Sequence, residues 1–247
     1  MKIIFNNRVL DENDRCISPL CSGFNFGEGF FTTIKVIENN ILHLNYHLER
    51  IEMSIIFFNF NLPKLNFENL IKTVLRENNL NSARVKIVIF KDLERVSFLI
   101  STTKLPYKSM VHELQVSKKI RGNDPIYNYK SLNYYNNLQN SNTIFKDHKE
   151  RLLETGIANI FLINGESILT PPATLPLLPG VIRTHLLSLK NIGGYTIFEK
   201  EIYTEDLKSC DGFFITNSIR GIEVVSRIDS LRIPTDRVKN IQGLLKL

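Results

Sequence analysis

The sequence predicts an α+β protein of two domains. Three observations support this class: a length of 247 residues, strand patterns interleaved with helical periodicity in the first half, and a connector that leads into a strand-rich second half. A chain of this length suffices for one large domain or two modest ones. We therefore expect an N-terminal domain over residues 1–118, a connector over 119–129 and a C-terminal domain over 130–247.

The first half alternates strands with helices. Residues 1–10 predict two short strands with a turn at Asn6-Asn7, and the β-branched and aromatic stretch 30–37 predicts a longer strand that returns over 41–44. Apolar residues spaced three or four apart predict a helix from His47 to about Phe58. The further elements expected in this half are a helix at 67–77 and strands at 83–90 and 95–102.

The second half begins after the turn-forming run Gly122-Asn123-Asp124-Pro125. Its patterns predict strands at 143–147, 158–164, 212–216 and 222–228, and helices at 180–190 and 204–209.

Composition and charge exclude several classes of protein. The net charge of +6 comes from basic residues that are spread along the chain, often beside acidic ones, which argues against nucleic-acid binding. No apolar run approaches the roughly 18–20 residues that span a bilayer. The N-terminus becomes polar too early for a signal peptide, so we expect a cytoplasmic protein with reduced cysteines at positions 16, 21 and 210 and no metal site.

The stretch from Glu154 to Arg183 contains the strongest candidate functional residues. Leu178-Pro179-Gly180 leads into an apolar helix that starts near Val181. Free backbone N–H groups at a helix start form an anion site, and a glycine there lets a phosphate approach the backbone. Upstream, Glu154 precedes a strand that belongs in the core, where a carboxylate needs a partner.

The order of the short motifs along this stretch is a specific signal. Glu154, then Asn159-Ile160-Phe161, then Thr170-Pro171, then the run from Leu178 to Arg183 resembles the signature of the class IV aminotransferases. This resemblance implies fold type IV: a small N-terminal α/β domain and a larger β-rich, pseudo-barrel C-terminal domain, with the cofactor pyridoxal 5'-phosphate (PLP) between them. It also implies a homodimer that acts on a small molecule with amino and carboxylate groups.

The resemblance also implies a set of site residues. Lys130, in Lys130-Ser131-Leu132-Asn133, resembles the lysine that forms an imine with PLP. The carboxylate of Glu154 would bond the pyridine nitrogen and keep it protonated. The cofactor phosphate would be bound by Arg50 of the run His47-Leu48-Glu49-Arg50, by the N–H groups of Val181 and Ile182, and by residues of the late turn: Asn217 and Ser218, with Thr216 as the fallback for the hydroxyl.

The chain departs from the family pattern between its two central residues. Lys130 and Glu154 are 154 − 130 = 24 residues apart, fewer than the family helix between them requires. Residues 134–142 therefore indicate a shortened helix, followed by the intact strand at 143–147.

The resemblance leaves more than one reaction open. Phe31-Thr32-Thr33, Asn217 and the short chain favour an aminodeoxychorismate lyase, which forms 4-aminobenzoate and pyruvate for folate biosynthesis, with Lys130 and Thr32 as catalytic residues. A D-amino-acid or branched-chain transaminase is the alternative, since transaminase relatives more often carry Glu where Thr32 stands. A non-catalytic family member is the third option. Arg121 and Arg220 are candidate ligands for the substrate carboxylate, although solvated surface arginines are the simpler interpretation.

Overall fold

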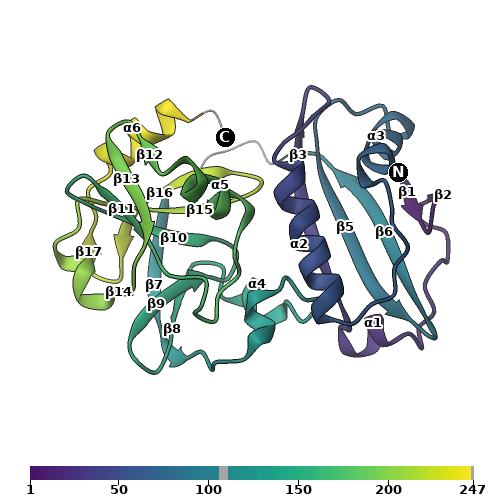
Figure 1. Ribbon diagram of the computed structural model, residues 1–247, viewed down its shortest axis with the longest axis horizontal. Coiled ribbons are helices and arrows are strands. Elements are labelled where there is room, and N and C mark those ends of the chain that lie inside the picture. The colour runs from purple at the N-terminus through teal and green to yellow at the C-terminus, as the bar shows by residue number, and fades with distance from the viewer. Residues whose placement is uncertain (106–110, 246–247) are drawn as a thin grey trace. The chain divides into compact units, whose positions relative to one another are not determined.

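The computed structural model describes residues 1–105 and 111–245 (Figure 1). The chain divides into two compact units. The first consists of Met1–Tyr107 and Lys130–Asn133, and the second of Lys108–Tyr129 and Tyr134–Leu247. The four residues that begin with Lys130 therefore belong to the first unit. The boundary expected at residue 118 falls inside a strand of the second unit, and the connector expected at 119–129 belongs to that unit as well.

The first unit is built on an antiparallel sheet with the strand order β2-β1-β6-β5-β3-β4. Two of its hairpins turn through residue pairs with positive φ, Asn6-Asn7 (46° and 65°) and Glu38-Asn39 (49° and 63°). Asn tolerates this left-handed conformation better than most residues, which suits it to such turns. The strands are β1 (Lys2–Phe5), β2 (Arg8–Asp11), β3 (Gly29–Ile37), β4 (Asn40–Ile41), β5 (Ala83–Asp92) and β6 (Arg95–Thr103).

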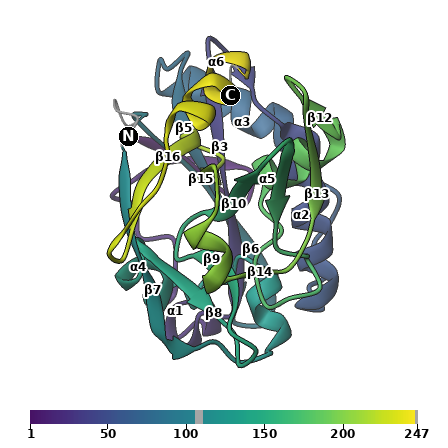
Figure 2. The ribbon, with the colours of Figure 1, turned by 90° about the vertical axis from the view of Figure 1, so that its left-hand side faces the viewer.

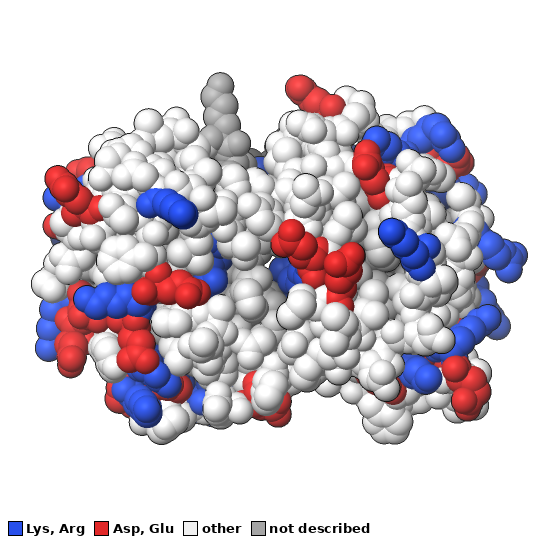
Figure 3. Space-filling model, viewed as in Figure 1, with Lys and Arg blue, Asp and Glu red and all other residues white. Residues whose placement is uncertain are grey.

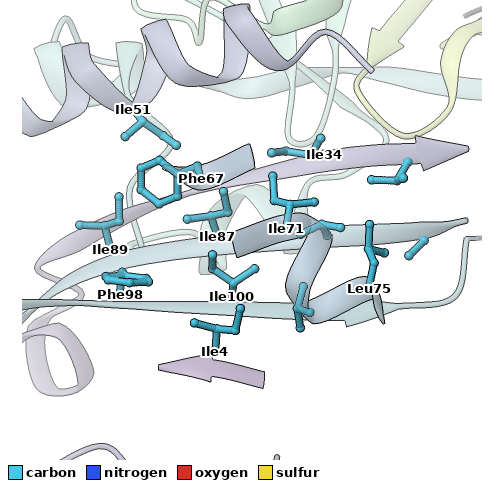
Figure 4. Packing of buried hydrophobic residues seen from close by; sticks show 14 of the residues in the cluster. Ile4, Ile34, Ile51, Phe67, Ile71, Leu75, Ile87, Ile89, Phe98 and Ile100 are labelled. Carbon is cyan, nitrogen blue, oxygen red and sulfur yellow. The ribbon is translucent and has the colours of Figure 1, made fainter. Parts of the chain in front are cut away.

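Two helices cover one face of this sheet, α2 (Leu44–Phe57) and α3 (Phe67–Glu77), and a short helix α1 (Ser22–Phe26) precedes β3. Because side chains alternate along a strand, Ile34, Ile87 and Ile100 all point to the helices. They meet Ile51 of α2 and Ile71 of α3 in one buried cluster (Figure 4). Each of these side chains contributes about 1.5–3 kcal/mol when fully buried.

The second unit is a closed six-stranded barrel with additional strands on its rim (Figure 2). The ring runs β10-β15-β16-β7-β8-β9 and closes where β9 pairs with β10 at Glu154 and Asn159. The ring strands are β7 (His112–Ile120), β8 (Thr143–Lys146), β9 (Arg151–Thr155), β10 (Asn159–Asn164), β15 (Gly212–Asn217) and β16 (Gly221–Ile228). The others are β11 (Ser167–Thr170), β12 (Asn191–Ile192), β13 (Tyr195–Glu199), β14 (Ile202–Tyr203) and β17 (Leu231–Arg232).

Two helices pack on strands of the barrel, α5 (Val181–Leu189) and α6 (Asp236–Leu244). They contribute Ile182, Leu186 and Val238 to a cluster that includes the stacked rings of Phe161 and Phe214, whose centroids are 4.8 Å apart. A separate cluster is formed by the alternate residues of the ring strands, which include Leu114, Ile144, Ile160, Ile215 and Val225. The barrel strands are thus buried on both faces, which explains their nearly continuous apolar runs.

The segment between Lys130 and Glu154 contains the shortened helix that its length predicted. This helix, α4 (Tyr135–Gln139), has five residues and leads into β8. The helix expected at 204–209 is a 3₁₀ helix, η2 (Thr204–Lys208), and another 3₁₀ turn, η1 (Pro125–Asn128), precedes Lys130.

None of the helices in the described part of the chain has the length and apolar character needed to cross a bilayer. On the face shown in Figure 3, Lys and Arg side chains lie close to Asp and Glu side chains and form no continuous basic field.

Candidate active site

Lys130 is held against the start of β3. The N–H of Phe31 donates to the carbonyl of Lys130 and the N–H of Leu132 donates to the carbonyl of Gly29, each at 2.9 Å. These bonds extend the sheet by one short antiparallel segment, in which Ser131 faces Phe30. Gly29 is required for the approach, because a Cβ there would lie 2.8 Å from the Leu132 side chain and 2.5 Å from a backbone oxygen of β5.

This register puts the side chains of Lys130 and Phe31 on one face of the sheet. The Lys130 Nζ lies 4.8 Å from the centroid of the Phe31 ring, and the Lys86 Nζ lies 4.4 Å from the same centroid. Such distances allow a cation–π attraction. One aromatic ring is therefore shared by two lysines, one of which is the expected cofactor lysine.

Further cations follow along the same face. Lys35 pairs across the strands with Arg84, and Thr33 pairs with Lys86. Burial lowers the pKa of Lys86, and the positive charge of Arg84 lowers it further; burial also lowers the pKa of Lys35. We call Lys35, Arg84 and Lys86 the cationic strip. Sequence reasoning missed it, although the period-two spacing of Arg84 and Lys86 within a predicted strand was the available signal.

Thr32 lies on the opposite face of β3, toward α2. Its side chain is 1% exposed, and its hydroxyl is 2.7 Å from Nδ1 of His47. The guanidinium of Arg50 donates a hydrogen bond to the same hydroxyl. Thr32 and Arg50, two of the predicted site residues, are therefore in direct contact, and His47 joins them.

In the second unit, Glu154 is buried where the barrel closes. One carboxylate oxygen accepts a hydrogen bond from Arg121 at 2.7 Å. The other accepts from the side-chain amide of Asn159 at 3.3 Å and from the backbone N–H of Leu178 at 3.2 Å. The expectation that this carboxylate needs partners in the core is confirmed, and the partners hold its orientation.

The interpretation of Arg121 as a solvated surface arginine was wrong. This residue is 5% exposed, and its guanidinium stacks between Phe145 and Tyr127, with ring centroids 3.9 and 4.7 Å away. It also donates to the carbonyl of Pro176 at 3.0 Å. A guanidinium is weakly hydrated and planar, so aromatic faces and a carboxylate can replace water around it. Glu154 is the carboxylate of this site.

The predicted helix start is present at α5. Gly180 is the N-cap, no side chain caps the helix, and its first turn has no acidic residue. The N–H groups of Val181 and Ile182 therefore have the arrangement of an anion site. A Cβ on Gly180 would lie 2.0 Å from the amide oxygen of Asn159, whose amide nitrogen donates to the carbonyl of Leu178 at 2.7 Å. Asn159 thus connects the loop before α5 with Glu154.

The late turn follows β15 in the same unit. Thr216 pairs across the strands with Asn159, and its hydroxyl is buried with no hydrogen-bond partner in the described structure. The side-chain oxygen of Asn217 accepts the backbone N–H groups of Ile219 and Arg220 at 3.1 and 3.0 Å, so it shapes the turn. Ser218 is partly exposed within that turn.

The second candidate arginine also has an acidic neighbour. Arg220 lies 3.5 Å from Glu223, a carboxylate buried in the barrel that is 3.1 Å from Nε2 of His112. The side chain of Arg220 is only partly exposed, so the description as a solvated arginine does not fit it fully.

The fold and these groups define a PLP-dependent enzyme class, and comparison with known proteins specifies the family. The model of the class IV aminotransferases ("Amino-transferase class IV") matches residues 29–228, so the chain belongs to this family. The fold is accordingly fold type IV, and the cofactor is pyridoxal 5'-phosphate; structures of this fold have been solved with pyridoxal or pyridoxamine phosphate bound.

Relatives with different activities resemble the chain to a similar extent. It is 26% identical to the aminodeoxychorismate lyase of Bacillus subtilis, over 93% of this chain and 87% of the relative. It is 20% identical to a D-alanine aminotransferase of Listeria innocua, over 94% and 89% of the two chains. The solved branched-chain amino acid aminotransferase of Escherichia coli superposes with a TM-score of 0.89 at 21% identity, over 98% of this chain and 92% of the other.

The residues of the second unit fit the cofactor chemically. A buried carboxylate suits a protonated ring nitrogen, and Glu154 supplies one. A phosphate needs N–H and O–H donors, which the uncapped start of α5 and the unpartnered hydroxyl of Thr216 supply. The expectation that Ser218 gives the phosphate hydroxyl, with Thr216 as the fallback, remains a prediction.

Proposed function

We propose that the protein is a PLP-dependent 4-amino-4-deoxychorismate lyase, which releases pyruvate and forms 4-aminobenzoate for folate biosynthesis. The observation that carries the proposal is the cationic strip on the Lys130 face of the sheet. The substrate carries two carboxylates besides its amine, and Lys or Arg side chains are the usual donors to such groups. A branched-chain amino acid would need an apolar surface for its side chain instead.

Two further observations support this reaction. Thr32 places a hydroxyl, not a carboxylate, beside Arg50. The aminodeoxychorismate lyase of Bacillus subtilis matches nearly the whole chain at 26% identity. A putative branched-chain-amino-acid aminotransferase of Methanocaldococcus jannaschii matches the whole chain at the same 26% identity, so the choice rests on the chemistry of the strip and of Thr32.

Lys130 is the residue that would hold the cofactor and exchange protons with the substrate. When bound, PLP supplies an electron sink for negative charge on the carbon next to the substrate amine. The amine of Lys130, once released, would take a proton from that carbon and return it later in the reaction. Lys86, on the same ring of Phe31, would attract the substrate carboxylate toward Lys130.

The remaining predicted residues would bind and orient. Glu154, held by Arg121, would keep a proton at the pyridine nitrogen. Arg50 and the N–H groups of Val181 and Ile182 would hold the phosphate, together with the hydroxyl of Ser218 or Thr216. Asn217 would shape the turn that carries them. Thr32 would serve the reaction through Arg50, which it contacts directly. By family resemblance we also propose a cytoplasmic homodimer.

The experiment is to incubate the purified holoenzyme with enzymatically generated aminodeoxychorismate and to follow 4-aminobenzoate by fluorescence and pyruvate by a coupled assay. We expect equal amounts of both products. Lys130→Ala should abolish their formation and the visible absorbance of the lysine-bound cofactor. Lys72→Ala, an exposed lysine on α3, is the matched control and should retain both.

The alternative is a D-amino-acid or branched-chain transaminase. It would be supported if the holoenzyme made no 4-aminobenzoate but formed keto acids from D-alanine or leucine in the presence of 2-oxoglutarate. A protein that shows no cofactor absorbance after incubation with PLP would instead be a non-catalytic family member.

A further inference from the structure

A small polar cluster lies between β3 and α2, with two of its three residues buried and Arg50 partly exposed. It consists of Thr32, His47 and Arg50. Thr32 and His47 are each 1% exposed. The Thr32 hydroxyl is 2.7 Å from Nδ1 of His47, and the guanidinium of Arg50 bonds the same hydroxyl. A second contact, 3.5 Å long, joins the Arg50 Nη2 to Nδ1 of His47.

The hydrogen atoms in this cluster can be assigned by elimination. A guanidinium only donates, so the Thr32 oxygen must accept from Arg50. The one hydroxyl proton then points to the nearest acceptor, which is Nδ1 of His47. This requires Nδ1 to be unprotonated and Nε2 to carry the ring proton. The approach of the Arg50 nitrogen to Nδ1 favours the same tautomer, because a second N–H at Nδ1 would face that donor.

The surroundings also keep His47 neutral. Burial lowers its pKa well below the usual value, and the positive charges of Arg50, His43 and Lys130 lower it further. Arg50 and His43 belong to α2 and its N-cap, Lys130 belongs to the segment beside β3, and β3 itself contributes the neutral Thr32. These three charged groups are all cationic, and each opposes protonation of the ring.

We propose that His47 is a positioning residue that fixes Arg50 through Thr32. The neutral imidazole accepts a hydrogen bond from the Thr32 hydroxyl, and the oriented hydroxyl then presents a lone pair to the guanidinium. A neutral anchor of this kind holds the arginine without adding a negative charge beside it, as a carboxylate would. The inference rests on the proposed role of Arg50 as a ligand of the cofactor phosphate.

The first test is independent of the reaction. Long-range ¹H–¹⁵N spectra of the histidine rings, with His47 assigned through His47→Gln, report which nitrogen is protonated. We expect a neutral ring with the proton on Nε2 from about pH 5.5 to 8, where a solvated histidine titrates. A charged ring at pH 7, or a neutral ring with the proton on Nδ1, would overturn the assignment.

The second test measures the affinity of the apoenzyme for PLP and for pyridoxal, which lacks the phosphate. His47→Leu should weaken the binding of PLP about tenfold, which is the scale of one hydrogen bond to a charged group. The same change should alter the affinity for pyridoxal by less than about twofold. His47→Gln, whose amide oxygen can still accept a hydrogen bond, should retain most of the affinity for PLP. His148→Leu, at an exposed turn, is the control and should change neither affinity.

Arg50→Gln distinguishes the phosphate-binding role of Arg50 from the positioning role of His47. We expect this change to remove most of the preference for PLP over pyridoxal and to make a further His47→Leu change silent. If Arg50→Gln leaves the preference intact, the phosphate role of Arg50 fails, and the positioning role of His47 fails with it. If Arg50→Gln acts as expected but His47→Leu does not, only the positioning role is refuted. A failure to form 4-aminobenzoate would leave these affinities unaffected.

Discussion

Arg121 offers the sharpest stability test, because it holds a charge in the core of the barrel unit. Arg121→Met keeps the aliphatic stem but removes the bonds to the Glu154 carboxylate and to the carbonyl of Pro176. The side chains of the ion pair are 2% and 7% exposed, so the remaining carboxylate cannot recover its hydration. Removing one partner of such a pair costs about 3–5 kcal/mol.

The structure places the expected cost near the lower end of this range. The carboxylate of Glu154 keeps two hydrogen bonds, from Asn159 and from the N–H of Leu178. The orphaned carbonyl of Pro176 adds about 1 kcal/mol. We therefore expect Arg121→Met to lower the free energy of unfolding by about 3–4 kcal/mol, the sum of a reduced pair penalty and this carbonyl.

The assay is urea unfolding of the apoprotein, followed by far-UV circular dichroism, so that bound cofactor does not add its own stabilisation. A double-mutant cycle with Glu154→Gln measures the coupling between the two side chains. Because the second change removes the buried charge, the double variant should be more stable than the sum of the single effects predicts by at least about 2 kcal/mol. Arg76→Met, an exposed arginine on α3, is the control and should change stability by less than about 0.5 kcal/mol. Additive effects of Arg121→Met and Glu154→Gln would refute the reasoning.

Three further outcomes follow from buried groups. His112→Leu removes the imidazole that lies 3.1 Å from the buried Glu223 carboxylate but leaves Arg220 at 3.5 Å, so it should destabilise by about 1–3 kcal/mol. The double change His112→Leu with Glu223→Leu should recover most of this loss in denaturant unfolding. Burial would raise the pKa of Asp147, but hydrogen bonds from the Arg151 side chain and from backbone N–H groups lower the pKa below its usual value. Stability from Asp147 is therefore present above the unfolded pKa of about 3.9 and is lost as the pH falls through the folded value, so Asp147→Asn should converge with the parent in acid unfolding curves. Gly156→Ala places a Cβ 2.0 Å from a backbone carbonyl oxygen of α4. The overpacking should cost about 1–3 kcal/mol and lower the melting temperature by several degrees. An unchanged melting temperature would show that α4 can shift to make room for the methyl group.

Local periodicity identified the elements whose partners are close in sequence. The strands β5 and β6 form a hairpin, and α2 and α3 carry apolar stripes that meet the same sheet. Strand β7 was not anticipated, because its partners β8 and β16 are parallel and β16 lies more than a hundred residues along the chain. The short strands β9, β11 and β13 were also missed. Although β9 and β11 pair with strands close in sequence, each of the three has five residues or fewer, which gives too short a pattern to recognise.

The candidate site likewise contains residues that the sequence could predict and residues whose surroundings it could not. The order of the motifs along the chain predicts Lys130, Glu154 and the start of α5 as site residues, and their roles stay predictions. In the structure Lys130 lies beside β3, Glu154 is buried, and α5 starts without a side-chain cap. The environment of Arg121 was misjudged, because nothing near it in sequence shows that Phe145 and Glu154 will surround it. The burial of a charged residue is a property of the groups that replace its water, and here these come from distant strands.

The sequence by itself determined the family and its cofactor, because the motif is a run of residues whose types and spacing carry the chemistry. It also determined that the helix after Lys130 is short, because length alone limits that element. Only the tertiary structure decided that Thr32 turns toward His47 and Arg50 while Lys130 and Lys86 share the ring of Phe31. Which face of a strand meets a helix depends on pairing register and packing, and these are settled by contacts between residues far apart in the chain.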